Sequence, residues 1–376
     1  MQLTPFQLDS AIIALRTVLP LEYPADGILR HFFRENPLLG GQDRAFIAET
    51  VFGILRHRFF LESLTERITP RSLVLAYLVK FNGMNLRELT SLISESETKW
   101  LAEIKAIKLE TLPLAIQAEF PEWLVEKLKQ SMTDADILNL GFSLQKSAPL
   151  DLRVNTILAK RNQVLETLSQ EGIEAQETPY SPCGIRLTGK PAINRHELFL
   201  SGKIEVQDEG SQLLGYLLAP KRGEMVVDFC AGAGGKSLLL GALMNSKGRL
   251  YAFDISEKRL NNLKPRFKRS GLSNLHAQRI ANENDIKVKR LAGKIDRVLV
   301  DAPCSGLGTL RRNPDLKWRQ SSQSIDELKA KQAAILSAAA SLLKPGGRLV
   351  YATCSFLPEE NQQVVQEFLN THPQFS

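Results

Sequence analysis

The chain has 376 residues, of which 43% are hydrophobic and 24% charged, proportions that are ordinary for a globular protein with two or three domains. No apolar run is long enough to cross a bilayer, and no basic segment followed by an apolar one marks a signal peptide. We therefore expect a cytoplasmic protein that does not bind membranes. The formal net charge of +7 permits a polyanionic partner such as RNA but does not demonstrate one.

Four cysteines are scattered over the chain, at Cys183, Cys230, Cys304 and Cys354. They show neither CxxC spacing nor the spacing of metal ligands, and the five histidines show no ligand spacing either. Few and scattered thiols are typical of a reducing compartment rather than of a disulfide framework. The sequence therefore predicts no metal site.

Residues 1–145 predict an all-helical domain. Apolar residues recur there at helical spacing, and short loops with Pro or Gly separate the segments. The segments with the clearest spacing are 6–19, 44–64, 122–132 and 132–145, the last of them capped by Thr133 or Asp134. Residues 146–203 then predict a small α/β unit, with strands at 150–154 and 184–187 and a helix at 160–172.

Residues 204–376 alternate between strands and helices. Strands are expected at 224–230, 248–255, 275–280, 296–302 and 347–354, and helices at 209–220, 234–244, 256–271 (capped by Ser256) and 324–343. Strands that are apolar throughout and separated by helices favour a parallel sheet covered on both faces. Ligands of such sheets bind beyond the carboxyl ends of the strands. The conspicuous residues all fall there: Asp228, Cys230, Asp254, Asp301, Cys304 and Cys354.

The sequence DFCAGAGGKS, residues 228–237, leads from a strand through a glycine-rich turn into a helix. Small residues let a ligand approach the backbone, and a helix N-terminus offers unpaired N–H groups. A phosphate loop is disfavoured because the glycine spacing fits neither common phosphate-binding pattern. The turn alone could be purely structural, but Asp254 follows 20 residues after Gly234 and could hold the ribose hydroxyls of a nucleoside.

A nucleoside cofactor, two strand-end thiols and a strand-end carboxylate fit one reaction. Carbon 5 of a pyrimidine is a poor nucleophile until a thiolate adds to carbon 6, after which it can attack an electrophilic methyl group. A carboxylic acid with a pKa raised by burial would stabilise the adduct at ring nitrogen 3, and a base would finally remove the proton from carbon 5. Asp301, Cys304 and Cys354 are the candidates for these roles.

The motifs around these residues resemble a known family. DAPCSG (301–306) and YATCS (351–355) look like the paired signatures of RNA cytosine-C5 methyltransferases. The segments LRVNT, VQDEGSQL, LRRNPDLKW and CSFLPEEN also match, and GQDRAFIAETVFGILRHR is similar to the NusB-like domain of the bacterial 16S ribosomal RNA branch. The resemblance implies a Rossmann-like class I methyltransferase domain over 204–376, a helical NusB-like RNA-binding domain over 1–145 and a small α/β linker domain over 146–203.

The resemblance also implies roles for single residues. Cys354 matches the cysteine that attacks carbon 6, Cys304 the cysteine that assists release of the methylated base, and Asp301 the carboxylate that holds the cytosine edge. The implied cofactor is S-adenosylmethionine. The implied partner is RNA, and the similarity of the helical domain points to 16S ribosomal RNA. The protein is expected to act as a monomer. The residues matching the cofactor site are Cys230, Ala231, Gly232, Ala233, Gly234, Gly235, Lys236, Asp254 on the ribose, Asn282 on the adenine side, and Asp301.

Three features depart from the family pattern. Gly232 and Ala233 replace an Ala-Pro pair, so we expect a more flexible loop. Asn282 replaces an acid, although its amide oxygen can still accept a hydrogen bond from the adenine amino group. Family members continue into a further strand pair, so we expect that this chain is truncated at its C-terminus and leaves a sheet edge beside a helix near residues 360–370.

Several alternatives stay open. The protein could be an RNA-binding assembly factor with lost or weak methylation activity, or it could methylate tRNA. A DNA cytosine methyltransferase would use Cys304 as the nucleophile and leave Cys354 without a role. The segment LRRNPDLKWR (310–319) favours a substrate-contacting loop, while Trp318 fits a base-stacking face and a core anchor equally well. Two interpretations of five arginines stay open, an RNA-facing patch and a solvated helix face. These residues are Arg30, Arg34, Arg44, Arg56 and Arg58.

Overall fold

The chain folds into two compact units. The structure, a computed structural model, describes residues 3–376. The first unit, which we call the helical unit, contains the described residues up to Ser147 together with Ser305–Ile325 and Cys354–Leu357. The second, the sheet unit, contains Ala148–Cys304, Asp326–Thr353 and Pro358–Ser376. The predicted division into three successive domains, 1–145, 146–203 and 204–376, stays a prediction about the organisation of the chain.

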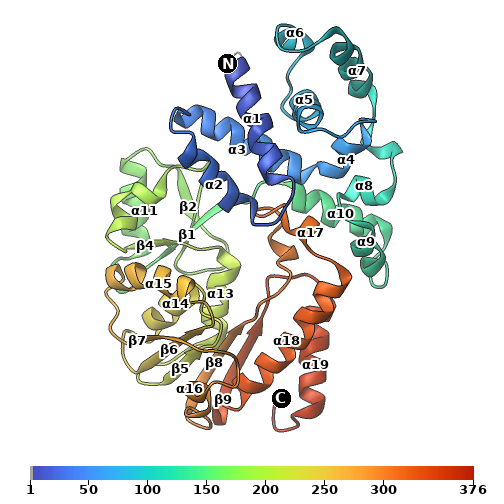
Figure 1. The fold of residues 1–376 in the computed structure, drawn as a ribbon. Helices are drawn as coiled ribbons and strands as arrows, with labels where there is room; N and C mark the ends of the chain where they lie inside the picture. Colours follow the sequence, from blue (N-terminus) through green and yellow to red (C-terminus); the bar gives the residue numbers. More distant parts are fainter. Residues whose placement is uncertain (1–2) are drawn as a thin grey trace. The chain divides into compact units, whose positions relative to one another are not determined.

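The helical unit consists of short helices, as predicted for residues 1–145 (Figure 1). They are α1 (Pro5–Val18), α2 (Ala25–Glu35), α3 (Gly41–Arg56), α4 (Arg58–Ser63), α5 (Pro70–Lys80), α6 (Leu86–Leu89), α7 (Glu95–Ala106), α8 (Leu114–Ala118), α9 (Glu122–Leu128), α10 (Asp134–Gln145) and the much later α17 (Leu316–Arg319). The single helix predicted over 44–64 is wrong. His57 interrupts it with a φ of −114° and a ψ of 31°, and its ring stacks on Phe81 at 3.9 Å.

Side-chain caps begin several of these helices. Each cap accepts a hydrogen bond from the backbone amide three residues later, which satisfies one of the unpaired N–H groups of the first turn. The capping residues are Thr4, Thr69, Ser94 and Thr133. Thr133, rather than Asp134, is therefore the cap of α10. Among residues 3–376, none of the helices is long and apolar enough to cross a membrane.

A small antiparallel sheet opens the sheet unit. Its strand order is β2-β3-β1-β4, with β1 (Leu150–Val154), β2 (Ala175–Glu177), β3 (Gly184–Leu187) and β4 (Ile204–Val206). The helices α11 (Arg161–Gln170) and α12 (Glu197–Leu200) accompany it. The predictions of β1, α11 and β3 are confirmed. The strands β2 and β4 were not predicted, because three residues are too few to show an alternating pattern.

The larger sheet has five parallel strands in the order β7-β6-β5-β8-β9. The strands are β5 (Met225–Asp228), β6 (Arg249–Asp254), β7 (Leu275–Arg279), β8 (Ile295–Asp301) and β9 (Leu343–Ala352). The helices are α13 (Glu209–Leu218), α14 (Gly235–Leu243), α15 (Glu257–Arg269), α16 (Ile286–Lys289), α18 (Ser322–Ala340) and α19 (Gln362–Thr371). The parallel sheet is thus confirmed, and Ser256 caps α15 as predicted.

Both faces of this sheet are covered, because neighbouring residues of each strand point to opposite sides. Val226 of β5 belongs to one hydrophobic cluster with Leu240 of α14 and Leu263 of α15. Its neighbour Val227 belongs to a second cluster with Ile335 and Ala339 of α18. Because all five strands run in the same direction, their carboxyl ends meet at one edge, which is where the candidate site begins.

Candidate functional site

Three aspartates end three adjacent strands. Asp228, Asp254 and Asp301 are the last residues of β5, β6 and β8, and the sheet order places β5 between the other two. Strand β9 pairs with β8 up to this edge, with Asp301 opposite Ala352, and the Ala302 amide donates to the Ala352 carbonyl at 2.8 Å. Each of these two paired strands therefore runs directly into one of the cysteine motifs.

Asp301 is paired with a cation. Lys236 Nζ, in the first turn of α14, lies 2.7 Å from Asp301 Oδ2. The Asp301 side chain is 32% exposed and that of Lys236 is 16% exposed. The chemical argument from the sequence expected Asp301 to be buried, and that expectation is wrong. An adjacent ammonium group stabilises a carboxylate.

The loop between β5 and α14 is fixed by its backbone. Gly232 and Gly234 have positive φ angles of 57° and 79°, which glycine adopts without strain. The Gly232 amide donates to Asp254 Oδ2 at 2.8 Å, and Arg266 Nη1 donates to the Ala233 carbonyl at 2.6 Å. Side chains of α15 and of the β6 end therefore hold both residues that replace the family's Ala-Pro pair.

The two side chains predicted to contact the nucleoside differ in their surroundings. Asp254 is 5% exposed, and its second oxygen accepts from the Ser256 amide at 2.7 Å. Its first task is thus to shape the loop, although each carboxylate oxygen can accept a further hydrogen bond. Asn282 is exposed, and its amide oxygen accepts from the Asn284 amide at 2.9 Å within its own turn. A contact between Asn282 and an adenine stays a prediction.

Burial raises the pKa values of two groups at this edge. The pKa of Asp228 is raised to about 7, mainly by burial and in part by the charge of Asp301, while the hydrogen bond from Ser237 Oγ at 2.6 Å opposes the rise. Burial also raises the pKa of the Cys230 thiol, and the charges of Asp228 and Asp301 add to the effect. A thiol with a raised pKa is a poor nucleophile, so the inert interpretation of Cys230 is favoured.

A buried glutamine in the sheet unit contacts the residue that precedes Cys304. Gln332 of α18 is 0% exposed, and its Nε2 donates to the Pro303 carbonyl and to Glu360 Oε1, both at 3.0 Å. Asn361 Oδ1 accepts from Thr353 Oγ1 at 2.6 Å. Sequence reasoning missed Gln332. The available signal was a polar side chain on the apolar face of the predicted helix 324–343.

The two motif cysteines belong to different units. Cys304 is half-buried and ends a stretch of the sheet unit, whereas Cys354 is exposed and begins a short stretch of the helical unit. Cys183, the remaining thiol, is buried in the core of the small sheet, as the inert interpretation requires. No group of side chains suited to a metal ion occurs within residues 3–376.

Comparisons with known proteins assign this arrangement to a family. A family model described as 16S rRNA methyltransferase RsmB/F matches residues 215–376, and an RsmF/B-like ferredoxin-like domain model matches residues 120–194. The probable ribosomal RNA small subunit methyltransferase B of Synechocystis sp. is 31% identical, covering 96% of this chain and 88% of its own length. This chain belongs to the RsmB/F methyltransferase family. The enzyme of Yersinia pseudotuberculosis is 38% identical over 68% of this methyltransferase and 58% of its own length.

Solved structures agree with this assignment. The structure of PH0851 superposes on this methyltransferase with a TM-score of 0.81 at 28% identity, covering 99% of this chain and 91% of that one. A methyltransferase homolog from Pyrococcus horikoshii gives a TM-score of 0.62 at 29% identity, over 70% of this chain and 83% of that one. NSun6 from the same organism, solved with the S-adenosylmethionine analogue SFG, shares the fold at a TM-score of 0.62 and 22% identity. The Rossmann-like fold is confirmed, and the cofactor of the family is S-adenosylmethionine.

The residues at the strand edge fit this cofactor. Gln207 Oε1 is buried and has no hydrogen-bond partner among the described residues, so it could accept from an ammonium group. A Cβ on Gly235, the first residue of α14, would lie 3.7 Å from both Gln207 Nε2 and Arg266 Nη2. These donors flank a helix N-terminus, where a carboxylate is favoured. A Cβ on Gly232 would meet nothing within 4 Å, so a ligand can approach that backbone.

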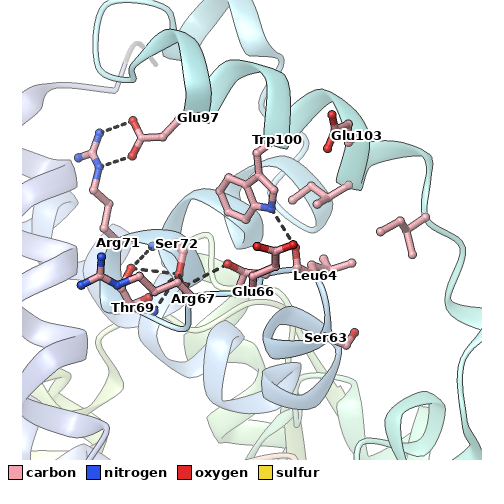
Figure 2. A pocket seen from close by; sticks show the side chains of 13 residues that line it. Ser63, Leu64, Glu66, Arg67, Thr69, Arg71, Ser72, Glu97, Trp100 and Glu103 are labelled. Atoms are coloured by element: carbon pink, nitrogen blue, oxygen red, sulfur yellow. Dashed lines mark hydrogen bonds and ion pairs between the residues drawn. The ribbon is translucent and has the colours of Figure 1, made fainter.

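A pocket in the helical unit is separate from these residues. It has a volume of about 690 Å³ and is lined only by residues between Ser63 and Ile107 (Figure 2). Two of its charged side chains pair with each other, with Arg71 Nε 2.7 Å from Glu97 Oε1. Trp100 Nε1 donates to the Leu64 carbonyl at 2.9 Å. None of the predicted site residues lines this pocket.

Side chains of the basic segment 310–319 bind partners within the helical unit. Trp318 Nε1 donates to the Leu55 carbonyl at 2.8 Å, and its ring packs against Phe59 at 4.5 Å. Trp318 is therefore a core anchor in this structure. Of the arginines left open by the sequence, Arg56 donates to the Arg311 carbonyl and Arg58 pairs with Glu62. Neither has its guanidinium directed solely to solvent, so a patch of all five arginines is disfavoured.

Proposed function

We propose that this methyltransferase transfers the methyl group of S-adenosylmethionine to carbon 5 of a cytosine in 16S ribosomal RNA, through a covalent bond between Cys354 and carbon 6. The pairing of β8 with β9 carries the proposal, because Asp301 lies opposite Ala352 and each strand runs directly into one cysteine motif. The names of the relatives, ribosomal RNA small subunit methyltransferase B, support the substrate class. We propose further that residues 1–145 bind the RNA and that the protein acts in the cytoplasm as a monomer.

The proposed reaction uses three side chains of the cysteine motifs. The Cys354 thiolate adds to carbon 6, and the electron pair of the 5,6 double bond makes carbon 5 nucleophilic. The bound cofactor supplies the electrophilic methyl group. In the release step the Cys304 thiolate takes the proton from carbon 5, the electron pair of that C–H bond re-forms the 5,6 double bond, and Cys354 leaves carbon 6 as a thiolate. Cys304 then returns its proton to solvent, so both cysteines regain their starting states.

Lys236 extends the role proposed for Asp301. The carboxylate can accept a hydrogen bond from the amino group of cytosine, while ring nitrogen 3 needs a proton as the thiolate adds. The Lys236 ammonium group, whose Nζ lies 2.7 Å from Asp301 Oδ2, is the proposed proton source: Asp301 takes a proton from Lys236 as it passes one to nitrogen 3, and Lys236 regains the proton when nitrogen 3 is deprotonated on release. We therefore propose that the two residues act as a pair.

The proposal is tested by the two cysteine variants with a 16S ribosomal RNA transcript and S-adenosylmethionine. Cys354→Ala should abolish turnover and adduct together. Cys304→Ala should form the adduct and then stall, so the RNA should migrate with the protein on a denaturing gel. The reverse result would favour the DNA-type assignment. Bisulfite sequencing of ribosomal RNA from a deletion strain locates the target, and an unchanged pattern in 16S RNA would favour tRNA or an assembly role.

A further inference from the structure

The chain after the first cysteine motif, Ser305–Ile325, is built into the helical unit. Leu307 and Ile325 are buried in one hydrophobic cluster with Leu124 of α9 and Ile137 of α10. We call this stretch the 305–325 segment. Because its apolar side chains share a core with the helices, the segment is fixed by them rather than free to move as a surface loop.

Polar groups of the 305–325 segment form hydrogen bonds with backbone groups at the ends of helices. Asp315 Oδ2 accepts from the amide of Ala25, the first residue of α2, whose own cap residue is a proline without a side-chain acceptor. Arg311 donates to the carbonyls of Lys146 and Ser147, which directly follow α10. Such terminal groups have no partner inside their own helix. The segment therefore supplies bonds that the helices cannot make by themselves.

Lys317 and Glu119 form a buried ion pair under the segment. Lys317 Nζ lies 3.8 Å from Glu119 Oε2, and the two side chains are only 4% and 2% exposed. Lys317 Nζ also donates to the carbonyl of Arg56, the last residue of α3, at 2.9 Å. The Glu119 carboxylate accepts from the amides of Phe59 and Phe60 in the first turn of α4, both at 3.0 Å. The pair thus joins the segment to the end of α3 and the start of α4.

Neither member of this pair is independent of the other. Burial raises the pKa of Glu119 to about 7 and lowers that of Lys317 to about 8, and the opposite charge of each partner counters the effect of burial. Arg56 and Glu62 are the other charged groups that act on them. Removing one partner leaves a buried charge without compensation, whereas removing both charges together does not.

The same unit contains the backbone of Cys354. The Gly308 amide donates to the Cys354 carbonyl at 2.8 Å, and a Cβ on Gly308 would approach the same oxygen to 2.8 Å. Ser305 Oγ donates to Ser355 Oγ at 3.2 Å, so the 305–325 segment contacts both Cys354 and Ser355 of the second cysteine motif. Contact this close transmits a displacement of the segment to Cys354.

We propose that Lys317 is a positioning residue for Cys354: by fixing the 305–325 segment to α3 and α4, it holds the Cys354 backbone where the thiol can attack the base. The inference rests on the proposed function, because it assumes that Cys354 forms the covalent bond. It assigns to the helical unit a task besides RNA binding. Displacement of a reacting group by about 1 Å is enough to slow a reaction by up to about 100-fold.

The test compares Lys317→Met with wild type in single-turnover adduct formation. The probe is a 16S ribosomal RNA transcript that contains 5-fluorocytosine, with S-adenosylmethionine present, because fluorine on carbon 5 prevents release. We expect the adduct rate to fall by about tenfold or more, while the dissociation constants for RNA and cofactor change by less than about twofold. The double variant Glu119→Gln, Lys317→Met should recover part of the rate, because it leaves no unpaired buried charge.

Arg71→Met is the matched control. It breaks another ion pair of the helical unit, Arg71–Glu97, which does not involve the 305–325 segment. At saturating RNA its adduct rate should stay near wild type, even where its unfolding midpoint or its affinity for RNA falls. An unchanged rate in Lys317→Met, or an equal loss in both variants, overturns the inference. If Lys317→Met does not fold, Trp318→Phe replaces it: it keeps an aromatic ring in the 305–325 segment but loses the hydrogen bond to the Leu55 carbonyl and the larger indole face on which Lys317 and Arg58 lie. A wild type without adduct refutes the proposed function instead.

Discussion

Replacing Asp228 by Asn should change how the stability of the sheet unit depends on pH. The folded protein holds the Asp228 proton up to a pKa of about 7, against an ordinary value of 3.8. Between these values the folded state binds a proton that the unfolded state has lost, so the stability is present at low pH and is lost as pH rises through 7. At about 1.4 kcal/mol per pH unit, the ionised carboxylate costs the fold at most about 4 kcal/mol above pH 7.

Asn keeps the acceptor for the Ser237 hydroxyl but cannot ionise. Its amide nitrogen would occupy the position of Asp228 Oδ1, which is buried and has no partner among the described residues. Protonated Asp228 also has a donor at this position, so the two proteins should have similar stabilities at pH 4. Between pH 5 and pH 8 the stability of wild type should fall by about 3 kcal/mol relative to that of Asp228→Asn.

Hydrogen exchange of peptides spanning residues 225–243 measures this difference. Tryptophan fluorescence would not, because Trp100, Trp123 and Trp318 all belong to the helical unit. Glu119 also has a raised pKa, so the pH dependence of wild type alone contains more than one group. The difference in stability between the variant and wild type isolates the contribution of Asp228. If the difference in stability between Asp228→Asn and wild type were the same at pH 5 and pH 8, the reasoning would be refuted.

Three further outcomes are expected. Gly308→Ala should slow adduct formation and cost about 1–3 kcal/mol of stability, because its methyl group would press on the Cys354 carbonyl; a wild-type adduct rate would contradict this. Arg266→Met removes the hydrogen bond to Ala233 and should weaken S-adenosylmethionine binding by about tenfold in calorimetry, whereas unaltered binding would show that the loop does not need it. Asp254→Ala should weaken the binding of S-adenosylmethionine by about 10- to 100-fold, while circular dichroism shows that the fold persists. An affinity equal to that of wild type would remove Asp254 from the site.

The parallel sheet could be predicted because its strands are uniformly apolar and its helices carry local caps. Ser256 and Thr133 are examples, since their positions follow from the residues next to them. The break at His57 was not predicted, and the residue there stacks on Phe81, a contact that no neighbouring residue reveals. The edge of the sheet, with its three aspartates, was predictable from strand direction alone.

What the sequence could not show is where the supporting side chains find their partners. Lys317 lies about 200 residues from Glu119 and about 260 from the carbonyl that it binds, so no local pattern relates them. The basic character of the segment suggested substrate contact, but burial shows that Lys317 and Asp315 are used within the fold. The pairing of Asp301 with Lys236 was missed for the same reason, although both residues stand in recognised motifs.

The assignment of Ser305–Ile325 and Cys354–Leu357 to the helical unit has a consequence during translation. The ribosome completes the first 147 residues long before it makes these pieces. At roughly 5–20 residues per second, about 10 to 40 s pass before Leu357 is added. During that interval the carbonyls at the end of α3 and the apolar surface around Leu124 and Ile137 lack the partners seen here. The nascent N-terminal helices should then attract a chaperone, and a recombinant fragment 1–147 should aggregate.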